Sequence, residues 1–363
     1  MVALEFPKHA SELTPDLLTQ VLSEQYPEVE VADLRVVEEA HCDTGSASTA
    51  ARAVLDLDFA PGRDAGLPGR VVLKTILVRR GAPGSLYRNE VRFYREIRSE
   101  LSIETPTAYA SLFDDASDTF GVVMEDLRLR SAEFPNATGS MTQAQITSAL
   151  DQLAALHGHF WQSPRFEGDL DWLWTPLSGG FHDFLAGAGA AFIRQLIAQS
   201  EYKQELFERL GRNFDDVWQH LWKAQAIIAS EPSTLLHGDT HFGNSYFLPG
   251  GRVGLLDWQL LNRGRWSHDV TYLLVTALDI ESRRTHEREL IGYYLDRLRS
   301  AGVEHAPEPE AAWLAYRQTA IWGFVFGWLI CPTENYGETI LRANLERLTA
   351  ALEDLETFAA LAD

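Results

Sequence analysis

HGDTHFGNSYFLPGGRVGLLDWQ, residues 237–259, is the stretch of this 363-residue chain that predicts its fold. It places Asp239 and Asn244 five positions apart in a short polar loop, and it places Asp257 thirteen positions later, at the end of an apolar run. Short apolar segments flank a Pro-Gly-Gly turn at 249–251, which predicts a hairpin between the loop and Asp257. The stretch therefore combines three polar side chains with a compact local structure that can hold them.

The order of these residue types suits transfer of a phosphoryl group from a magnesium nucleotide to a hydroxyl. That reaction needs positioning, charge neutralisation and one base near the acceptor hydroxyl. Asp239 is the candidate base, because a carboxylate can accept a hydrogen bond from an alcohol. Asn244 and Asp257 offer the hard oxygen ligands that suit Mg²⁺. A His-Gly-Asp triplet alone can also be a simple turn, so the interpretation depends on the whole stretch and on features upstream.

The stretch resembles the protein-kinase pattern of a base Asp, an Asn five positions later and a metal-binding Asp after the next hairpin. His-Gly-Asp at 237–239 replaces the usual His-Arg-Asp, and Asp-Trp-Gln at 257–259 replaces Asp-Phe-Gly. These variants look like the aminoglycoside phosphotransferase and choline kinase superfamily, and the wording HGDTHFGN resembles its ecdysteroid-kinase-like branch.

The resemblance implies an α+β, two-lobed protein-kinase-like fold. It implies a small N-terminal antiparallel β-sheet lobe with one key helix and a larger, mainly helical C-terminal lobe. We expect residues 1–124 to form the nucleotide-binding lobe with a leading helix, and 125–131 to form a hinge. Residues 132–363 would then form the helical lobe with the catalytic loop and the acceptor site.

Two charged residues upstream fit a nucleotide lobe. Residues 70–78, RVVLKTILV, are typical of a strand, and alternation puts Lys74 on a face with apolar neighbours. Residues 86–101 predict a helix whose apolar stripe includes Glu90. The resemblance implies a Lys74–Glu90 ion pair that lets Lys74 hold the nucleotide phosphates. The alternative is a solvated surface Lys and a surface Glu.

The resemblance also implies adenine and phosphate contacts. Residues 120–124, FGVVM, predict a buried strand, and the backbone around Glu125 and Leu127 after it resembles the hinge that reads the base of ATP or GTP. An ordinary strand end is the alternative. The phosphate loop is the weakest match, because CDTGSAST at 42–49 has a single Gly; Ser46 is its candidate phosphate donor.

The expected function is magnesium-dependent transfer of the γ-phosphate of ATP or GTP to a hydroxyl of a small molecule. The short segment after Asp257 leaves no room for the peptide-docking platform of protein kinases, so we expect a small alcohol as acceptor. Amino sugars, choline or ethanolamine, macrolides and apolar alcohols all stay open, with a tilt towards a bulky, partly apolar alcohol. A nucleotide-binding pseudokinase is one alternative. A metal-dependent hydrolase using His237, Asp239 and His241 is another.

Composition narrows the partners and the compartment. A net charge of −21 and a pI near 4.9 disfavour nucleic acid and anionic membranes as partners. The polar start lacks a signal-peptide pattern, and two distant cysteines fit a reducing compartment, so a cytoplasmic location is expected.

Several segments around the loop have expected supporting roles. His157 is expected to be a structural hydrogen-bonder, and Asp269 is expected to brace the catalytic loop. Residues 181–230 predict a helical stretch that either covers the acceptor or forms a solvated helical pair. The aromatic segment 311–330 predicts a buried core helix, although it is long enough to approach a membrane span. Its rings could also wall an acceptor pocket.

Overall fold

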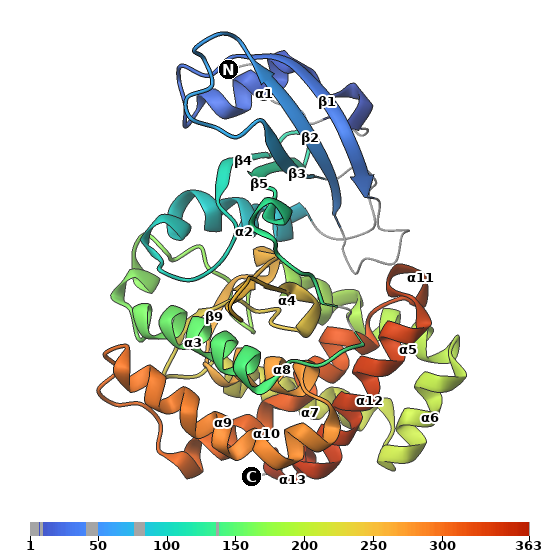
Figure 1. Ribbon diagram of the computed structural model, residues 1–363. Coiled ribbons are helices and arrows are strands. Elements are labelled where there is room, and N and C mark those ends of the chain that lie inside the picture. Colours follow the sequence, from blue (N-terminus) through green and yellow to red (C-terminus); the bar gives the residue numbers. More distant parts are fainter. Residues whose placement is uncertain (1–6, 8–9, 41–49, 76–83, 136–137, 363) are drawn as a thin grey trace. The chain divides into compact units, whose positions relative to one another are not determined.

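The computed structural model describes residues 7, 10–40, 50–75, 84–135 and 138–362, and the chain forms two compact units (Figure 1). The first unit comprises Met1–Glu100 and Thr105–Ala132. The second comprises Leu101–Glu104 and Glu133–Asp363.

The first unit is built on a five-stranded antiparallel sheet with the order β1-β2-β3-β5-β4. A short 3-10 turn and helix α1 precede the sheet, and helix α2 follows its third strand. The bounds are η1 (Ala10–Glu12), α1 (Pro15–Ser23), β1 (Val31–Ala40), β2 (Ala51–Phe59), β3 (Arg70–Thr75), α2 (Gly84–Arg92), β4 (Ala108–Asp114) and β5 (Thr119–Glu125).

Local sequence explains the ends and faces of these elements. Thr14 caps α1 by accepting a hydrogen bond from the Leu17 N–H, and Pro15 takes the first helical position, where no N–H is needed. The apolar face of α1 packs with one face of the sheet, and residues such as Leu18 and Leu55 are fully buried there. This cluster is the core of the first unit.

The helix predicted for residues 86–101 is present but irregular. It begins as α2, continues as a π-helix (η3, Phe93–Ile97) and ends as a 3-10 turn (η4, Arg98–Glu100). Glu90 and Tyr94 are buried, whereas Glu96 and Glu100 are exposed, as the apolar stripe predicted.

The second unit is mainly helical and carries two small two-stranded sheets. Strand β6 (Thr234–Leu236) pairs with β9 (Asn262–Gly264), and β7 (Ser245–Phe247) pairs with β8 (Val253–Leu255). The second pair is the predicted hairpin. It therefore lies between the polar loop and Asp257.

The rest of the second unit is built from helices. A capping box between Thr142 and Gln145 starts the first of them. The α-helices are α3 (Gln143–His159), α4 (Gly180–Phe184), α5 (Ala190–Ala198), α6 (Glu201–Leu210), α7 (Phe214–Ile228), α8 (Ser267–Ala277), α9 (Ile280–Ser300), α10 (Pro309–Trp322), α11 (Thr333–Tyr336), α12 (Glu338–Asp354) and α13 (Thr357–Ala360).

The aromatic segment near residue 320 is a buried core element. Helix α10 ends at Trp322 and continues as a seven-residue π-helix (η10, Gly323–Leu329). Gly323 and Gly327 let it approach Tyr272, because a Cβ at either position would lie under 3.0 Å from the tyrosine ring atoms. In the described part of the chain, no helix is both long and apolar enough to cross a membrane.

Candidate active site

The polar loop is held in place by the carboxylate of Asp269. Its two oxygens accept hydrogen bonds from the backbone N–H groups of His237 (2.7 Å) and Gly238 (2.9 Å), and Oδ2 also lies 3.1 Å from His157 Nε2. Burial opposes ionisation of Asp269, yet the hydrogen bond to His157 and the nearby imidazoles lower its pKa. Asp269 and His157 therefore have the supporting roles that the sequence predicted.

Only glycine fits at position 238, where the loop passes closest to the segment that follows Asp257. Its φ is +84°, and a Cβ there would lie 2.0 Å from the Leu260 carbonyl oxygen. The loop thus depends on Gly238 to pass the segment that follows Asp257.

Asp239 and Asn244, five positions apart in sequence, are in direct contact. Asn244 Nδ2 donates to Asp239 Oδ2 (3.0 Å) and to the Asp239 carbonyl (2.9 Å). Asp239 is half-buried and Asn244 is buried. Because the amide nitrogen is used by Asp239, Asn244 Oδ1 is the atom that can face a cation.

Asp257 is brought to the same loop by its neighbour Leu256. Leu256 donates its N–H to the Asn244 carbonyl (2.8 Å), and its own carbonyl lies 2.8 Å from His237 Nε2. Asp257 itself has φ 66° and ψ 75° and is 6% exposed. A non-glycine residue in this left-handed region costs on the order of 1–3 kcal/mol and is often found at functional sites.

The histidines of the loop are used structurally. His237 Nε2 bonds the Leu256 carbonyl, and its Nδ1 accepts the Asp239 N–H (3.2 Å); His241 Nδ1 accepts the Gly243 N–H (3.0 Å). Burial lowers the pKa of His237, and it lowers that of His241 to about 4. Among the described residues no group of three or more His, Cys, Asp or Glu can hold a metal ion. These contacts argue against the hydrolase alternative.

In the first unit, Lys74 of β3 and Glu90 of α2 form the predicted ion pair. Lys74 Nζ lies 2.9 Å and 2.7 Å from the two carboxylate oxygens, and the side chains are only 3% and 1% exposed. A buried pair of this kind is stable only because both charges are present. Its role in holding phosphates stays a prediction.

The predicted base-reading segment begins where β5 ends. Glu125 is the last residue of β5, and its Oε1 accepts the Thr107 N–H (2.8 Å). Leu127 starts a 3-10 turn (η5, Leu127–Arg130), and its carbonyl accepts the Ala132 N–H (3.2 Å). The Leu127 carbonyl is therefore already used within the turn, and binding of the nucleotide base by this segment stays a prediction. Ser46, the candidate phosphate donor, lies outside the described residues.

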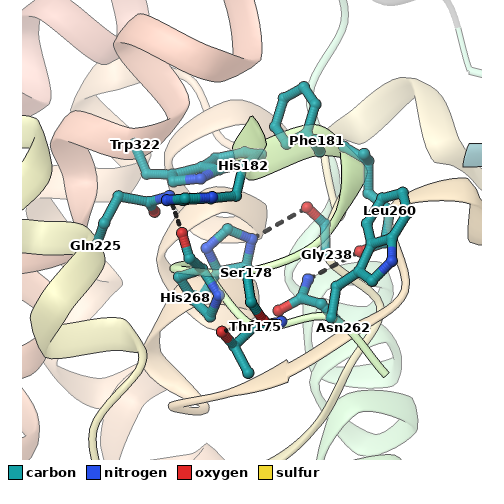
Figure 2. Close-up of a pocket in the computed structure, with 12 residues that line it drawn as sticks. Thr175, Ser178, Phe181, His182, Gln225, Gly238, Leu260, Asn262, His268 and Trp322 are labelled. Carbon is teal, nitrogen blue, oxygen red and sulfur yellow. Dashed lines mark hydrogen bonds between the residues drawn. The ribbon is translucent and has the colours of Figure 1, made fainter. Parts of the chain in front are cut away.

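A pocket opens beside Gly238 within the second unit (Figure 2). Its enclosed volume is about 30 Å³, and the space without atoms reaches about 400 Å³ only when the open solvent at its mouth is counted. Rings of Trp174, Phe181 and Trp322 contribute to its apolar lining, and Gln225 and His268 contribute polar groups. Both segments left open by the sequence, 181–230 and 311–330, thus supply lining residues. The sequence did not predict that residues 174–178 line a pocket, because this segment has no periodic pattern.

Gln225 carries an unusual polar atom in this lining. Its Nε2 donates to the Pro176 carbonyl (2.9 Å), which fixes the orientation of the amide. Its Oε1 is buried without a hydrogen-bond partner, and the residue is 3% exposed. A buried acceptor left unpaired costs about 1–3 kcal/mol, so the atom calls for an explanation.

His268 offers a second acceptor in the lining. Its Nε2 lies 3.0 Å from the Gly238 carbonyl, so this nitrogen carries the hydrogen (Figure 2). Burial lowers the pKa of His268, which favours the neutral ring and leaves Nδ1 as an acceptor. The ring packs edge-on against Trp322, with 4.3 Å between centroids.

Comparisons with known proteins indicate the family and the fold of the chain. The model of the phosphotransferase enzyme family matches residues 64–313. No curated protein sequence matches the chain significantly.

Solved structures resemble the chain over most of its length. A choline kinase from Cryptosporidium parvum Iowa II is 10% identical, with a TM-score of 0.55 and coverage of 94% of this chain and 96% of that one. The GDP complex of aminoglycoside 2'-phosphotransferase-IIIa is 10% identical, with a TM-score of 0.47 and coverage of 94% and 99%. Spectinomycin phosphotransferase with ADP and spectinomycin is 13% identical, with a TM-score of 0.48 and coverage of 97% and 94%. The similarity to the choline kinase shows that the predicted α+β protein-kinase-like fold is correct.

Proposed function

This chain belongs to the phosphotransferase enzyme family, and from that premise we propose that it transfers a nucleotide γ-phosphate to a hydroxyl of a small molecule. The observation that carries the proposal is the contact between Asn244 Nδ2 and the Asp239 carboxylate, 3.0 Å apart in a loop fixed by Asp269. A base needs a fixed position near the acceptor oxygen, and this contact supplies one.

Asp239 is the proposed base. Its carboxylate accepts the proton of the acceptor hydroxyl as that oxygen attacks the γ-phosphorus. The bond from the γ-phosphorus to the oxygen bridging the β- and γ-phosphates breaks, and ADP or GDP leaves. Asn244 holds the Asp239 carboxylate through its amide nitrogen, which turns the base towards a single position. Loss of this contact would remove one restraint on the carboxylate, and phosphoryl transfer depends mainly on such positioning.

The oxygen ligands of the loop fit Mg²⁺. Asn244 Oδ1 and the Asp257 carboxylate are hard oxygens, and the backbone of Leu256 ties the two residues together. When bound, Mg²⁺ neutralises charge on the phosphates. The left-handed backbone of Asp257 sets the direction of its carboxylate, which supports a ligand role.

In the first unit we propose that Lys74 binds the nucleotide phosphates and that Glu90 holds its ammonium in place. The backbone of Glu125 and Leu127 would bind the base of ATP or GTP, and Ser46 would donate to a phosphate. The buried Lys74–Glu90 pair supports the first of these roles, because the two hydrogen bonds to Glu90 fix the position of a positive charge.

A small acceptor fits the segment after Asp257. Only a short 3-10 turn (η9, Trp258–Leu260) and strand β9 precede helix α8 at Ser267. This leaves no platform of the kind that protein kinases use for peptides. The aminoglycoside and choline kinases among the compared structures are named for small alcohols.

The test is a screen over a library of small alcohols that measures ADP release from Mg-ATP and GDP release from Mg-GTP. The Asp239→Asn variant is the blank, and Asp171→Asn, at an exposed position of the same unit, is the matched control. We expect at least one alcohol to raise ADP release for the wild type and the control, with no rise for Asp239→Asn. Equal release by the wild type and Asp239→Asn with every alcohol would contradict the proposal.

A further inference from the structure

A cluster of rings connects the catalytic loop to the short helix α11. The ring of His241 packs edge-on against Trp328, with 5.4 Å between centroids, and Trp328 packs edge-on against Tyr336 at 5.7 Å. His241 also contacts Tyr272, at 6.1 Å. His241, Tyr272 and Trp328 are buried. Tyr336 is partly exposed, and so is Asp239, two positions before His241. The buried rings thus form a floor beside which two polar side chains stay accessible.

The charge of the proposed base acts on this cluster. Burial raises the pKa of Tyr272, and the Asp239 carboxylate raises it further. The neighbouring Cys331, burial and the charge of Asp239 raise the pKa of Tyr336 well above its usual value. Asp239 and the hydroxyl of Tyr336 therefore belong to one electrostatic environment within the second unit.

The hydroxyl of Tyr336 has only a weak partner in Cys331. The two side chains are hydrogen-bonded, and the Cys331 thiol also donates to the Gly327 carbonyl (3.2 Å). A thiol sulfur is a weak acceptor compared with an oxygen or a nitrogen. The Tyr336 hydroxyl can therefore take a stronger partner from a ligand.

Lys203 fixes the segment that leads to α11. It is 1% exposed, and its Nζ donates to the carbonyls of Leu329 (2.8 Å) and Cys331 (2.9 Å) at the end of η10. A buried ammonium requires such fixed acceptors, so this end of the π-helix is held in one position. The floor under Tyr336 is then formed before a ligand binds, and preorganisation of this kind favours binding.

Resting on the proposed function, we propose that Tyr336 is a specificity residue for the acceptor. Its hydroxyl hydrogen-bonds to a second polar group of the alcohol whose reacting hydroxyl lies at Asp239. An acceptor that covers the floor removes water from Tyr336, and a buried polar group without a good partner costs binding free energy. The acceptor must therefore supply that partner. This favours alcohols with a further O–H or N–H over alcohols that have a single hydroxyl.

The experiment compares both kinds of alcohol on the full chain. Phenyl β-D-glucopyranoside and kanamycin A carry several O–H groups, whereas choline has one hydroxyl and no further O–H or N–H. Any better acceptor from the library screen is added to the kind that it matches. KM and kcat are measured by ADP release from Mg-ATP, and the Kd for Mg-ATP is measured by calorimetry. We expect the lowest KM for an alcohol with a second O–H or N–H.

Tyr336→Phe removes the hydroxyl and keeps the ring against Trp328. Loss of one hydrogen bond to a neutral group should raise KM for the best such alcohol roughly three- to tenfold, with kcat within about twofold. The Kd for Mg-ATP and the KM for choline should not change. Tyr293→Phe is the matched control, because Tyr293 is also partly exposed and its hydroxyl bonds to Asp151 (2.9 Å) instead. This control should match the wild type.

The outcomes separate the two proposals. ADP release with KM unchanged in Tyr336→Phe would leave phosphotransfer standing and overturn the role of Tyr336. ADP release with single-hydroxyl alcohols alone would do the same. A similar rise in KM for choline, or in the Tyr293→Phe control, would show a general structural effect and also overturn that role. Absence of ADP release with every alcohol would contradict phosphotransfer itself, and the role of Tyr336 would fall with it.

Discussion

Replacing Lys74 by Met should destabilise the first unit strongly, because it leaves Glu90 buried without its partner. The Glu90 side chain is 1% exposed, and Lys74 Nζ contacts both of its oxygens at 2.9 Å and 2.7 Å. Removing one member of a buried pair typically costs about 3–5 kcal/mol, since an uncompensated charge remains. Replacing both, as in Lys74→Met with Glu90→Leu, should recover most of that free energy of unfolding, to within roughly 1–2 kcal/mol of the wild type.

The assay must report on the first unit. All ten Trp residues follow residue 160, so Trp fluorescence follows the second unit. Urea unfolding monitored by hydrogen exchange of the β3 and β5 amides is therefore the measurement. Arg63→Met is the matched control, because Arg63 and Glu30 form an exposed pair in the same unit, 3.7 Å apart, and such pairs contribute about 0–1 kcal/mol. The prediction is wrong if Lys74→Met lowers the free energy of unfolding no more than Arg63→Met does. It is also wrong if the double variant is no more stable than Lys74→Met alone.

Two further predictions concern the catalytic loop. Gly238→Ala should lower the free energy of unfolding by about 2–3 kcal/mol or more and abolish ADP release, because the new Cβ would meet the Leu260 carbonyl. Gly250→Ala is the control, because Gly250 has a similar φ of +87° but open space around it. In thermal unfolding this control should show the cost of backbone strain alone. His241 has its pKa lowered from 6.5 to about 4 by burial, so the unfolded chain binds more protons between these values. Stability should therefore fall by roughly 3 kcal/mol as the pH drops through that window. His241→Asn, which keeps an acceptor for the Gly243 N–H, should flatten the pH dependence of the free energy of unfolding measured in urea titrations. An unchanged dependence on pH would show that His241 does not cause it.

The parts of the site that the sequence predicted are those with short, fixed spacing. Asp239 and Asn244 meet because one loop carries both, and Asp257 follows a hairpin whose turn is explicit in the chain. Lys74 and Glu90 were found because a charged residue on an apolar strand or stripe needs a partner. Each signal is local, so one sequence suffices to detect it.

The pocket could not be predicted in the same way. Its lining comes from separate segments around Trp174, Phe181, Gln225 and Trp322, and the unpaired Gln225 oxygen depends on a contact with Pro176. Helix irregularities were also hidden, since the π-helix at 323–329 depends on close packing of two glycines against Tyr272. Such features follow from tertiary contacts, which periodicity does not encode.

Other expectations stay predictions. These are the boundaries at 124 and 131, the ecdysteroid-kinase-like resemblance, the pseudokinase alternative and the roles of Ser46, Glu125 and Leu127. The phosphate loop at 42–49 lies outside the described residues.

The most direct test of the central claim is single-turnover transfer of labelled γ-phosphate to the best acceptor from the screen by Asp239→Asn, beside its Kd for the Mg-nucleotide. Loss of a general base typically costs about 10²–10⁴ in rate. We expect a loss of that size, with the Kd unchanged to within about threefold, because Asp239 acts on the acceptor hydroxyl. Transfer at near wild-type rate by Asp239→Asn would contradict it.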